Sequence, residues 1–242
     1  MSCNSTIARG LAAILTVALV TSAAAQKPAK PPQTPSQIEA AIQGDPDNPD
    51  LHVALGLAYL DKNDFPHALE AFQRAVKIAP SSAEAHNWLG VVIMEKADLP
   101  GAIAEFRKAV ALDPKSARAH TNLGSALAKS GEITEAVDVF KRALALEPHN
   151  MAAEMNLGVA LREQGETEEA LVHMRRVAAA EPKIASVQYE LGQTLRQSGD
   201  LPAAVACFEK ALEIDPELRE GYYGLGLALK KDRKSTRLNS SH

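Results

Sequence analysis

Three histidines, His52, His86 and His120, recur at one constant interval along the chain. Imidazole nitrogens are the commonest metal ligands in proteins, so this pattern first suggests a metal site. Packed helices of successive units would, however, lie about 8–10 Å apart, whereas zinc holds each nitrogen at about 2.0–2.1 Å. Three such histidines could not share one ion. The spacing therefore predicts no metal site, and the histidines are interpreted as substitutions within a repeated pattern.

Other residues whose side chains could take part in catalysis form no complete catalytic motif. Glu169 and His173 are four residues apart, but no second histidine completes a HExxH zinc site. Gly221 and Gly224 follow no predicted strand and precede no Gly-Lys-Ser/Thr, so they form no phosphate-binding loop. No acidic pair stands in an apolar pattern that would shift a pKa for acid–base catalysis. The sequence predicts a protein that is not an enzyme and has no cofactor.

The charge balance argues against a nucleic-acid partner. The formal net charge of the chain is −4. Residues 1–25 and 232–242, which are set apart below, carry four basic residues and one acidic residue, so the remainder carries −7. Binding to phosphates requires a concentrated basic surface. An acidic body is instead interpreted as a solvated surface that keeps the protein soluble.

The first 25 residues are typical of a secretory signal peptide. Arg9 precedes the apolar run Leu11–Val20, and Ala23–Ala25 offers small residues for cleavage after Ala25. We therefore expect a periplasmic or secreted protein that meets the membrane only during export. An uncleaved anchor is the alternative, although the 16 residues from Gly10 to Ala25 fall short of the ~20 that span a bilayer.

Two further segments lie outside the predicted fold. Residues 26–36 are rich in proline, which fixes φ and removes donors, so an extended linker is predicted. Residues 232–242 resemble the translation of a sequencing adapter, in which case the natural chain would continue differently after Lys231; an ordinary basic tail is the alternative. Cleavage of the signal would leave Cys207 as the one cysteine, without an internal disulfide, and either packed or able to pair with another chain.

A repeat with the same interval as the histidines organises the rest of the chain. The pair Leu-Gly recurs at this interval as Leu55-Gly56, Leu89-Gly90, Leu123-Gly124, Leu157-Gly158, Leu191-Gly192 and Leu225-Gly226. A large apolar residue follows in phase, at Phe72, Phe106, Phe140, Met174 and Phe208. Small residues and prolines keep the same phase, for example Ala68, Ala102, Ala136, Ala170 and Ala204, and Pro80, Pro114, Pro148, Pro182 and Pro216.

Each repeat is predicted to be a helical hairpin, with a helix A followed by a helix B. In the third repeat, apolar spacing predicts helix A over 117–130 and helix B over about 134–146. Gly131 can adopt φ > 0 and end helix A, while Pro148 cannot continue helix B. Asn150 is a suitable N-cap for the next helix. One hairpin cannot bury its apolar face alone, so neighbouring hairpins must stack.

This pattern resembles the tetratricopeptide repeat, whose unit is about 34 residues long. The resemblance implies an all-α fold, a right-handed α-solenoid of tandem helix-turn-helix repeats. Five complete repeats are expected over 49–218, with a sixth helix A cut short over 219–231. Residues 37–48 are in phase with helix B and are expected to form a half-repeat helix that covers the first hairpin.

The resemblance also implies a binding groove, because in this family the helices A line the concave side. The positions that point into that groove, together with adjacent Trp88 and two asparagines at the sixth position, give the expected site: Val53, Leu57, Asn87, Trp88, Val91, Asn122, Ser125, Met155, Asn156, Val159, Tyr189, Gln193 and Tyr223.

Asn122 and Asn156 share the sixth position of adjacent repeats. In some family members, asparagines at this position bind the backbone of an extended peptide, since an amide both donates and accepts. The alternative is that they satisfy local backbone groups. The family's carboxylate clamp requires a lysine at the fifth position, and no repeat here has one.

The resemblance implies a non-catalytic scaffold that holds a protein or peptide segment in its groove, with no nucleic acid or small-molecule substrate. Together with the signal peptide, it suggests a scaffold of the bacterial envelope. The alternative is the recognition arm of a larger enzyme or envelope assembly whose C-terminal part is missing from this sequence.

Overall fold

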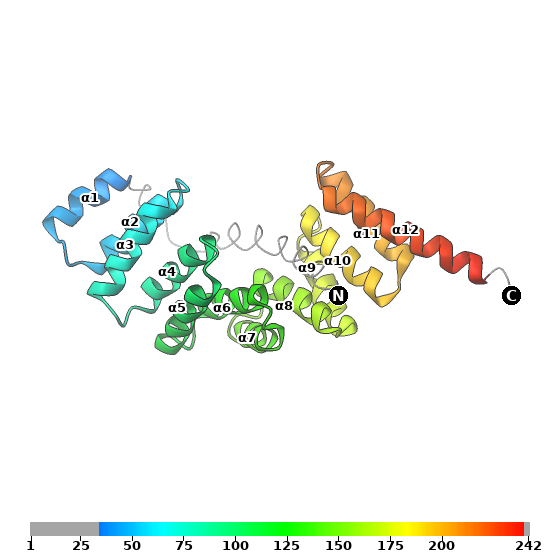
Figure 1. Cartoon of the computed structure of the whole chain (residues 1–242), viewed down its shortest axis with the longest axis horizontal. Helices are drawn as coiled ribbons and strands as arrows, with labels where there is room; N and C mark the ends of the chain where they lie inside the picture. The colour runs from blue at the N-terminus through cyan, green and yellow to red at the C-terminus, as the bar shows by residue number, and fades with distance from the viewer. Residues whose placement is uncertain (1–33, 240–242) are drawn as a thin grey trace, which may run out of the picture. The chain divides into compact units, whose positions relative to one another are not determined.

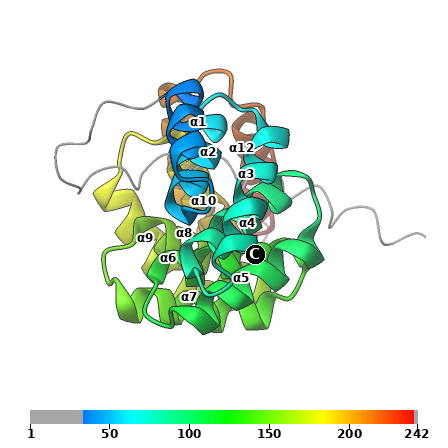
Figure 2. The ribbon, with the colours of Figure 1, turned by 90° about the vertical axis from the view of Figure 1, so that its left-hand side faces the viewer.

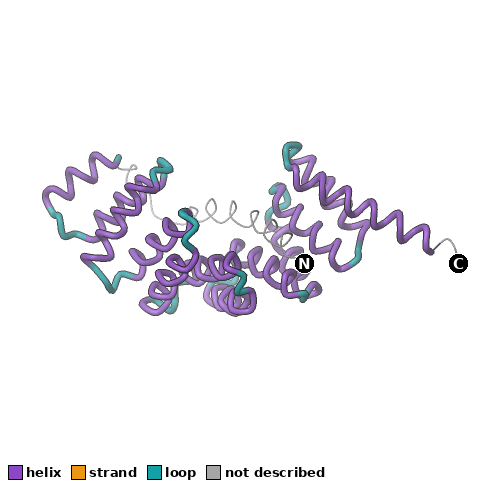
Figure 3. The backbone as a smooth tube through the Cα atoms, viewed as in Figure 1, coloured by secondary structure: helices purple, strands orange, loops and turns teal. Residues whose placement is uncertain are grey.

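The computed structural model describes residues 34–239, and nearly all of them lie in helices (Figure 1, Figure 3). The described residues form two compact units that divide between Pro148 and His149. The predicted signal peptide and most of the predicted linker lie outside the described residues. In the part of the chain that the structure describes, no helix is both long and apolar enough to span a bilayer.

The described residues of the first unit, 34–148, form seven helices. Their bounds are α1 Pro35–Gly44, α2 Pro49–Leu60, α3 Phe65–Ile78, α4 Ala83–Glu95, α5 Leu99–Leu112, α6 Ala117–Ser130 and α7 Ile133–Leu146. Each helix from α1 to α6 packs against the next in the chain, and α4 also contacts α6. Figure 2 shows α1 beside α2 at the start of this unit. Helix α1 begins at Pro35, two residues before the predicted start, because proline is tolerated in the first turn and Thr34 caps it.

The second unit contains five helices. Their bounds are α8 Met151–Gln164, α9 Thr167–Ala180, α10 Ala185–Ser198, α11 Leu201–Ile214 and α12 Arg219–Asn239. Consecutive helices again pack together, and α10 also contacts α8 and α12. Helix α12 continues to Asn239, eight residues beyond the predicted end at Lys231. The predicted class, an all-α solenoid of tandem helix-turn-helix repeats, is confirmed.

The turns within the hairpins share one backbone conformation. Gly131, Gly165 and Gly199 end their helices A with φ of 89°, 93° and 95°. Asn63 and Ala97 hold the equivalent position in the first two hairpins, with φ of 57° and 62°. An alanine side chain cannot form the local hydrogen bonds that stabilise the left-handed conformation, so the backbone at Ala97 is strained.

In the complete hairpins, the glycine of the Leu-Gly pair lets a side chain of helix B pack directly against the backbone of helix A. A Cβ atom built on Gly124 would lie 2.7 Å from Cε1 of Phe140, and one on Gly90 would lie 2.7 Å from Cε1 of Phe106. Such distances are shorter than any tolerable contact, so only glycine permits this approach. Phe72, Phe106, Phe140 and Phe208 are completely buried as a result.

Candidate functional site

The recurring histidines are structural. The Nε2 atom of His52 lies 2.9 Å from the carbonyl oxygen of Pro46, and His86 makes the same 2.9 Å contact with Pro80. Gln188 holds the equivalent position in the fifth hairpin, and its amide donates to the carbonyl of Pro182 over 3.3 Å. A backbone carbonyl in the loop between hairpins is a strong acceptor and is stabilised by a donor. These side chains supply it, which explains why polar residues occupy this buried position.

Two carboxylates with little exposure lie at or beside this position, Glu105 and Glu154. Glu105 accepts from His86 at 2.6 Å and from Lys108 at 2.7 Å. Burial alone would raise the pKa of Glu105, but the hydrogen bonds from Lys108 and His86 lower it below its usual range. In the fourth hairpin Glu154 replaces histidine and pairs with Arg176 at 2.6 Å and His173 at 3.0 Å. Within residues 34–233, no three metal-ligating side chains come together.

One candidate surface lies in the first unit on the adjacent helices A, α4 and α6. We call it the first face: Asn87, Trp88, Arg118 and Asn122. The amide of Asn122 donates to Oδ1 of Asn87 at 2.9 Å and so links the two helices. The half-buried Trp88 stacks on Phe72 with centroids 6.3 Å apart. The Arg118 guanidinium lies 5.8 Å from the centre of the Trp88 ring, within cation–π range.

Exposure separates the expected site residues of the first unit into those that a ligand can reach and those that it cannot. Val53, Asn87, Val91 and Ser125 are buried, whereas Leu57, Trp88 and Asn122 are half-buried. The Ser125 hydroxyl donates to the carbonyl of Thr121 at 2.9 Å. The accessible groups of the first face are therefore the Trp88 indole, the Arg118 guanidinium and the Asn122 amide.

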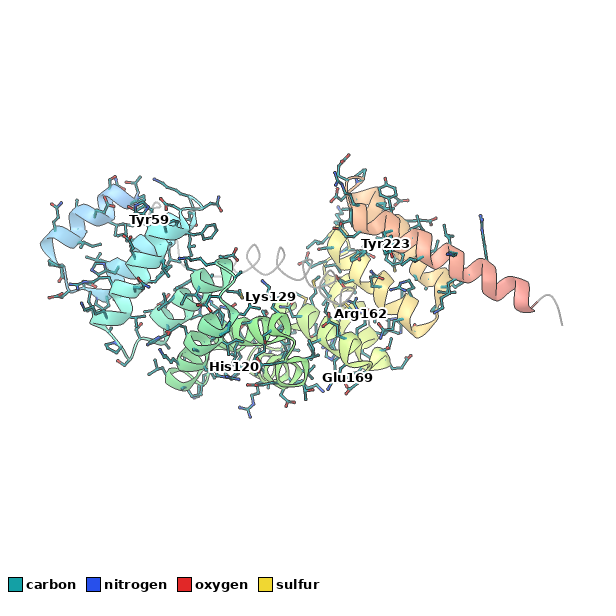
Figure 4. The ribbon with its side chains drawn as sticks, in the orientation of Figure 1. Tyr59, His120, Lys129, Arg162, Glu169 and Tyr223 are labelled. Atoms are coloured by element: carbon teal, nitrogen blue, oxygen red, sulfur yellow. The ribbon has the colours of Figure 1, made fainter. Side chains whose placement is uncertain are left out.

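A second candidate surface lies in the second unit on α8 and α10. We call it the second face: Arg162, Tyr189, Glu190, Gln193 and Arg196. The Arg162 guanidinium binds the Glu190 carboxylate at 2.6 Å, and both side chains have little exposure. Figure 4 labels Arg162 on α8. The Gln193 amide donates to the Tyr189 hydroxyl at 2.6 Å, and its oxygen accepts from Nε of Arg196 at 3.0 Å. This chain of contacts fixes the orientation of all three side chains.

Exposure divides the expected residues of the second unit in the same way. Met155, Asn156 and Val159 are buried, Tyr189 and Gln193 are half-buried, and Tyr223 on α12 is 70% exposed (Figure 4). Burial raises the pKa of Tyr189, although the hydrogen bond from Gln193 opposes the shift. The phenol therefore stays protonated and can donate to a ligand.

Arg162 and Glu190 form a pair that the sequence pattern did not reveal. The Arg162 guanidinium is held by the Glu190 carboxylate. Glu190 stands at the position that Asn122 and Asn156 hold in the two preceding repeats. The sequence separation of the two opposite charges could have indicated this ion pair. Arg107 and Glu135 have the same separation and also pair, at 3.0 Å.

The same pair acts on a neighbouring carboxyl group. Burial raises the pKa of Glu163, and the Glu190 carboxylate adds to the shift while Arg162 opposes it. Glu163 therefore holds a proton more readily than an exposed glutamate does.

Cys207 on α11 is half-buried. Burial raises the pKa of its thiol, with Asp200 adding to the shift and Lys210 opposing it. A higher pKa reduces the thiolate fraction and hence the reactivity of the sulfur.

Comparison with known proteins identifies the repeat. A tetratricopeptide repeat model matches residues 36–83, 53–117 and 121–185, and a second TPR repeat model matches residues 192–232. Sequence comparison with curated proteins finds none that matches this chain.

Several solved structures share the fold. PilF of Pseudomonas aeruginosa is 25% identical with a TM-score of 0.68, covering 82% of this chain and 90% of PilF. MamA is 29% identical with a TM-score of 0.59, covering 67% of this chain and 95% of MamA. YrrB, described as a TPR protein with an unusual peptide-binding site, is 22% identical with a TM-score of 0.64, covering 78% of this chain and 98% of YrrB. Because the repeat models match most of its length, this chain belongs to the tetratricopeptide repeat family.

Proposed function

We propose that this chain is a non-catalytic scaffold that binds a peptide segment of another protein on its helix A faces. The observation that carries the proposal is the half-buried ring of Trp88, held by Phe72 and accompanied by the Arg118 guanidinium. Aromatic residues and arginine in partly desolvated positions supply most of the binding energy in protein interfaces. A ring already fixed by its neighbours loses little conformational entropy on binding.

The chemistry of the two faces favours a peptide that carries apolar and acidic side chains. On the first face, Trp88 offers an apolar surface and Arg118 a cation, while Asn122 is a half-buried amide. On the second face, Tyr189 and Arg196 provide a hydroxyl and a guanidinium in fixed orientations. A guanidinium binds carboxylates through paired hydrogen bonds.

The binding proposal predicts that truncating the aromatic residues weakens peptide capture. Peptides are first selected against the wild-type chain from a random library displayed on phage. For each selected peptide, Trp88→Ala or Tyr189→Ala should weaken binding about 30-fold, corresponding to about 2 kcal/mol for an interface hot spot. The double variant should abolish capture of the whole selected pool. Fluorescence anisotropy measures the affinities, and circular dichroism checks that the helices remain.

The control for this experiment is Val172→Ala on α9. Val172 is an exposed apolar residue on a helix B and belongs to neither face. Its truncation should leave peptide affinity unchanged. Selected peptides that bind the double variant as tightly as wild type would rule out both faces as the site.

We further propose that the scaffold acts in the bacterial envelope, supported by the signal-peptide pattern of residues 1–25. When the full gene is expressed in a Gram-negative host, the exported protein should begin at Gln26, as read by N-terminal sequencing of the periplasmic fraction. Changing Ala23 and Ala25 to leucine removes the small-residue cleavage pattern and should leave the precursor in the membrane fraction. Wild-type protein that keeps residues 1–25 at the membrane would instead indicate an anchor.

A further inference from the structure

Lys129, near the end of α6, is a half-buried cation that no described residue neutralises (Figure 4). Within residues 34–233, the half-buried lysine and arginine side chains are Lys129, Arg162 and Arg196. Arg162 pairs with the Glu190 carboxylate, and Arg196 donates to the Gln193 oxygen. The Lys129 ammonium group makes neither an ion pair nor a hydrogen bond with any residue of this range.

The surroundings of the Lys129 ammonium group disfavour its charge. Burial lowers the pKa of this group, and the Glu95 carboxylate on α4 opposes the shift. Glu95 is exposed and forms no ion pair with Lys129. A carboxylate placed against the ammonium group would replace the lost hydration with a charge-assisted hydrogen bond. The position therefore favours an anionic group on a ligand.

Lys129 lies on the same side of α6 as Arg118 and Asn122 of the first face. The positions 118, 122, 125 and 129 follow one another in steps of four, three and four residues, which keeps their side chains on one face of a helix. About three helical turns separate Arg118 from Lys129, so their Cα atoms lie about 16 Å apart. The first face thus continues along α6 from one cation to another.

The amide between these two cations favours an extended ligand. The Asn122 amide nitrogen donates to Asn87, and its oxygen accepts no hydrogen bond from a described residue. An extended peptide has backbone N–H groups that can donate to this oxygen, whereas a helical peptide uses most of them internally. Extended chains advance about 3.3 Å per residue, so about five residues cover the distance between the two cations.

We propose that Arg118 and Lys129 bind two acidic side chains of one extended peptide, about four to six residues apart in its sequence. Trp88 would contact an apolar side chain beside the acid at Arg118, because its ring lies 5.8 Å from that guanidinium. This charge pattern rests on the proposed function and specifies which peptides the first face recognises.

The probes are peptides selected from a displayed random library against the full chain carrying Tyr189→Ala, so that binding relies on the first face. Synthetic copies are amidated at the C-terminus, so only side chains supply carboxylates. Each should carry two acidic residues at the stated separation. Lys129→Met should weaken binding at least about tenfold, the loss of one charge-assisted hydrogen bond, whereas Lys129→Arg should largely retain it. Fluorescence anisotropy measures the affinities.

A double-mutant cycle identifies the acid that Lys129 binds. In each peptide, the acid farther from the apolar residue is changed to its amide. This change should weaken binding to the same extent as Lys129→Met. The two changes together should weaken it no further, because both remove the same contact.

Lys77→Met is the matched control, since Lys77 is an exposed lysine in the last turn of α3 and Lys129 is in the last turn of α6. It should change peptide affinity by less than about twofold. Lys129→Met should lower the Tm no more than Lys77→Met does, because it removes a partly desolvated charge. A larger fall in the Tm would show that the fold depends on Lys129 and would contradict the proposal.

The outcomes separate this charge pattern from the proposed function. Affinity that depends on Trp88, but neither on Lys129 nor on the second acid, overturns the charge pattern alone. So does failure to select any peptide against the Tyr189→Ala chain when the wild-type chain yields some. Coupling to Lys129 in peptides that do not require Trp88 would support the two cations and exclude the aromatic anchor. Self-association of the full chain that Lys129→Met abolishes would assign Lys129 to a second copy and overturn the proposal.

Discussion

Replacing Arg162 with alanine should lower the free energy of unfolding of the second unit by about 3–5 kcal/mol, because it leaves the Glu190 carboxylate buried without its cation. Glu190 has only 4% of its surface exposed, so water cannot compensate the lost pair. Repeat proteins can unfold in several steps, so amide hydrogen exchange of α8 and α10 is the appropriate measurement. Both helices should lose protection.

Two variants separate burial from charge pairing in this experiment. Arg107→Ala breaks the Arg107–Glu135 ion pair, in which both side chains are about half exposed. It should lower the free energy of unfolding by less than about 1 kcal/mol. Replacing Arg162 with methionine and Glu190 with leucine together removes both charges and should be close to neutral or stabilising. The geometry indicates that the Arg162–Glu190 pair is desolvated. A loss of stability on Arg162→Ala no larger than that on Arg107→Ala would contradict this.

Replacing Phe140 with alanine should destabilise the third hairpin by about 3–5 kcal/mol, since a completely buried ring leaves a cavity between α6 and α7. Gly124→Ala in the wild-type chain should cost about 1–3 kcal/mol because its methyl group meets the same ring. In the Phe140→Ala background that substitution should instead be neutral or stabilising. Denaturant unfolding of the four members of this cycle measures the coupling.

Gly226→Ala is the matched control for the Gly124 substitution. Both glycines lie inside a helix A, but a methyl group on Gly226 has open space around it. Alanine is favoured over glycine in a helix by about 0.5–1 kcal/mol, so Gly226→Ala should stabilise the chain. A loss of stability at Gly226 similar to that at Gly124 would show that helix geometry, not the ring, explains the glycines.

The hairpins could be predicted from sequence because their information is local and repeated. Gly131 ends α6 in the left-handed conformation, and the Asn150 side chain caps α8, as the sequence indicated. Helix α6 has the predicted bounds, and α7 begins one residue before its predicted start. Periodicity averages out the ambiguity of any single residue, which is why the fold is well determined by the pattern.

The faces could be predicted only in part, because side-chain partners depend on contacts between repeats. Asn122 was assigned either to a peptide ladder or to local groups, and its amide in fact binds Asn87 of the preceding repeat. Arg162 pairs with Glu190 of the following repeat, a contact that the repeat pattern does not predict. Neither partner follows from residue type at one position. Each requires knowledge of which side chains on neighbouring helices A lie within reach.

The fit between each ring and its glycine also limits how such a gene can change length. Insertion or loss of one complete repeat keeps every Leu-Gly pair of the complete hairpins opposite a Phe or Met, so whole hairpins can be duplicated or deleted with the packing preserved. An insertion or deletion inside a helix instead shifts its register and takes the ring and its glycine out of contact. Growth by complete modules is therefore the mutational route that this packing leaves open.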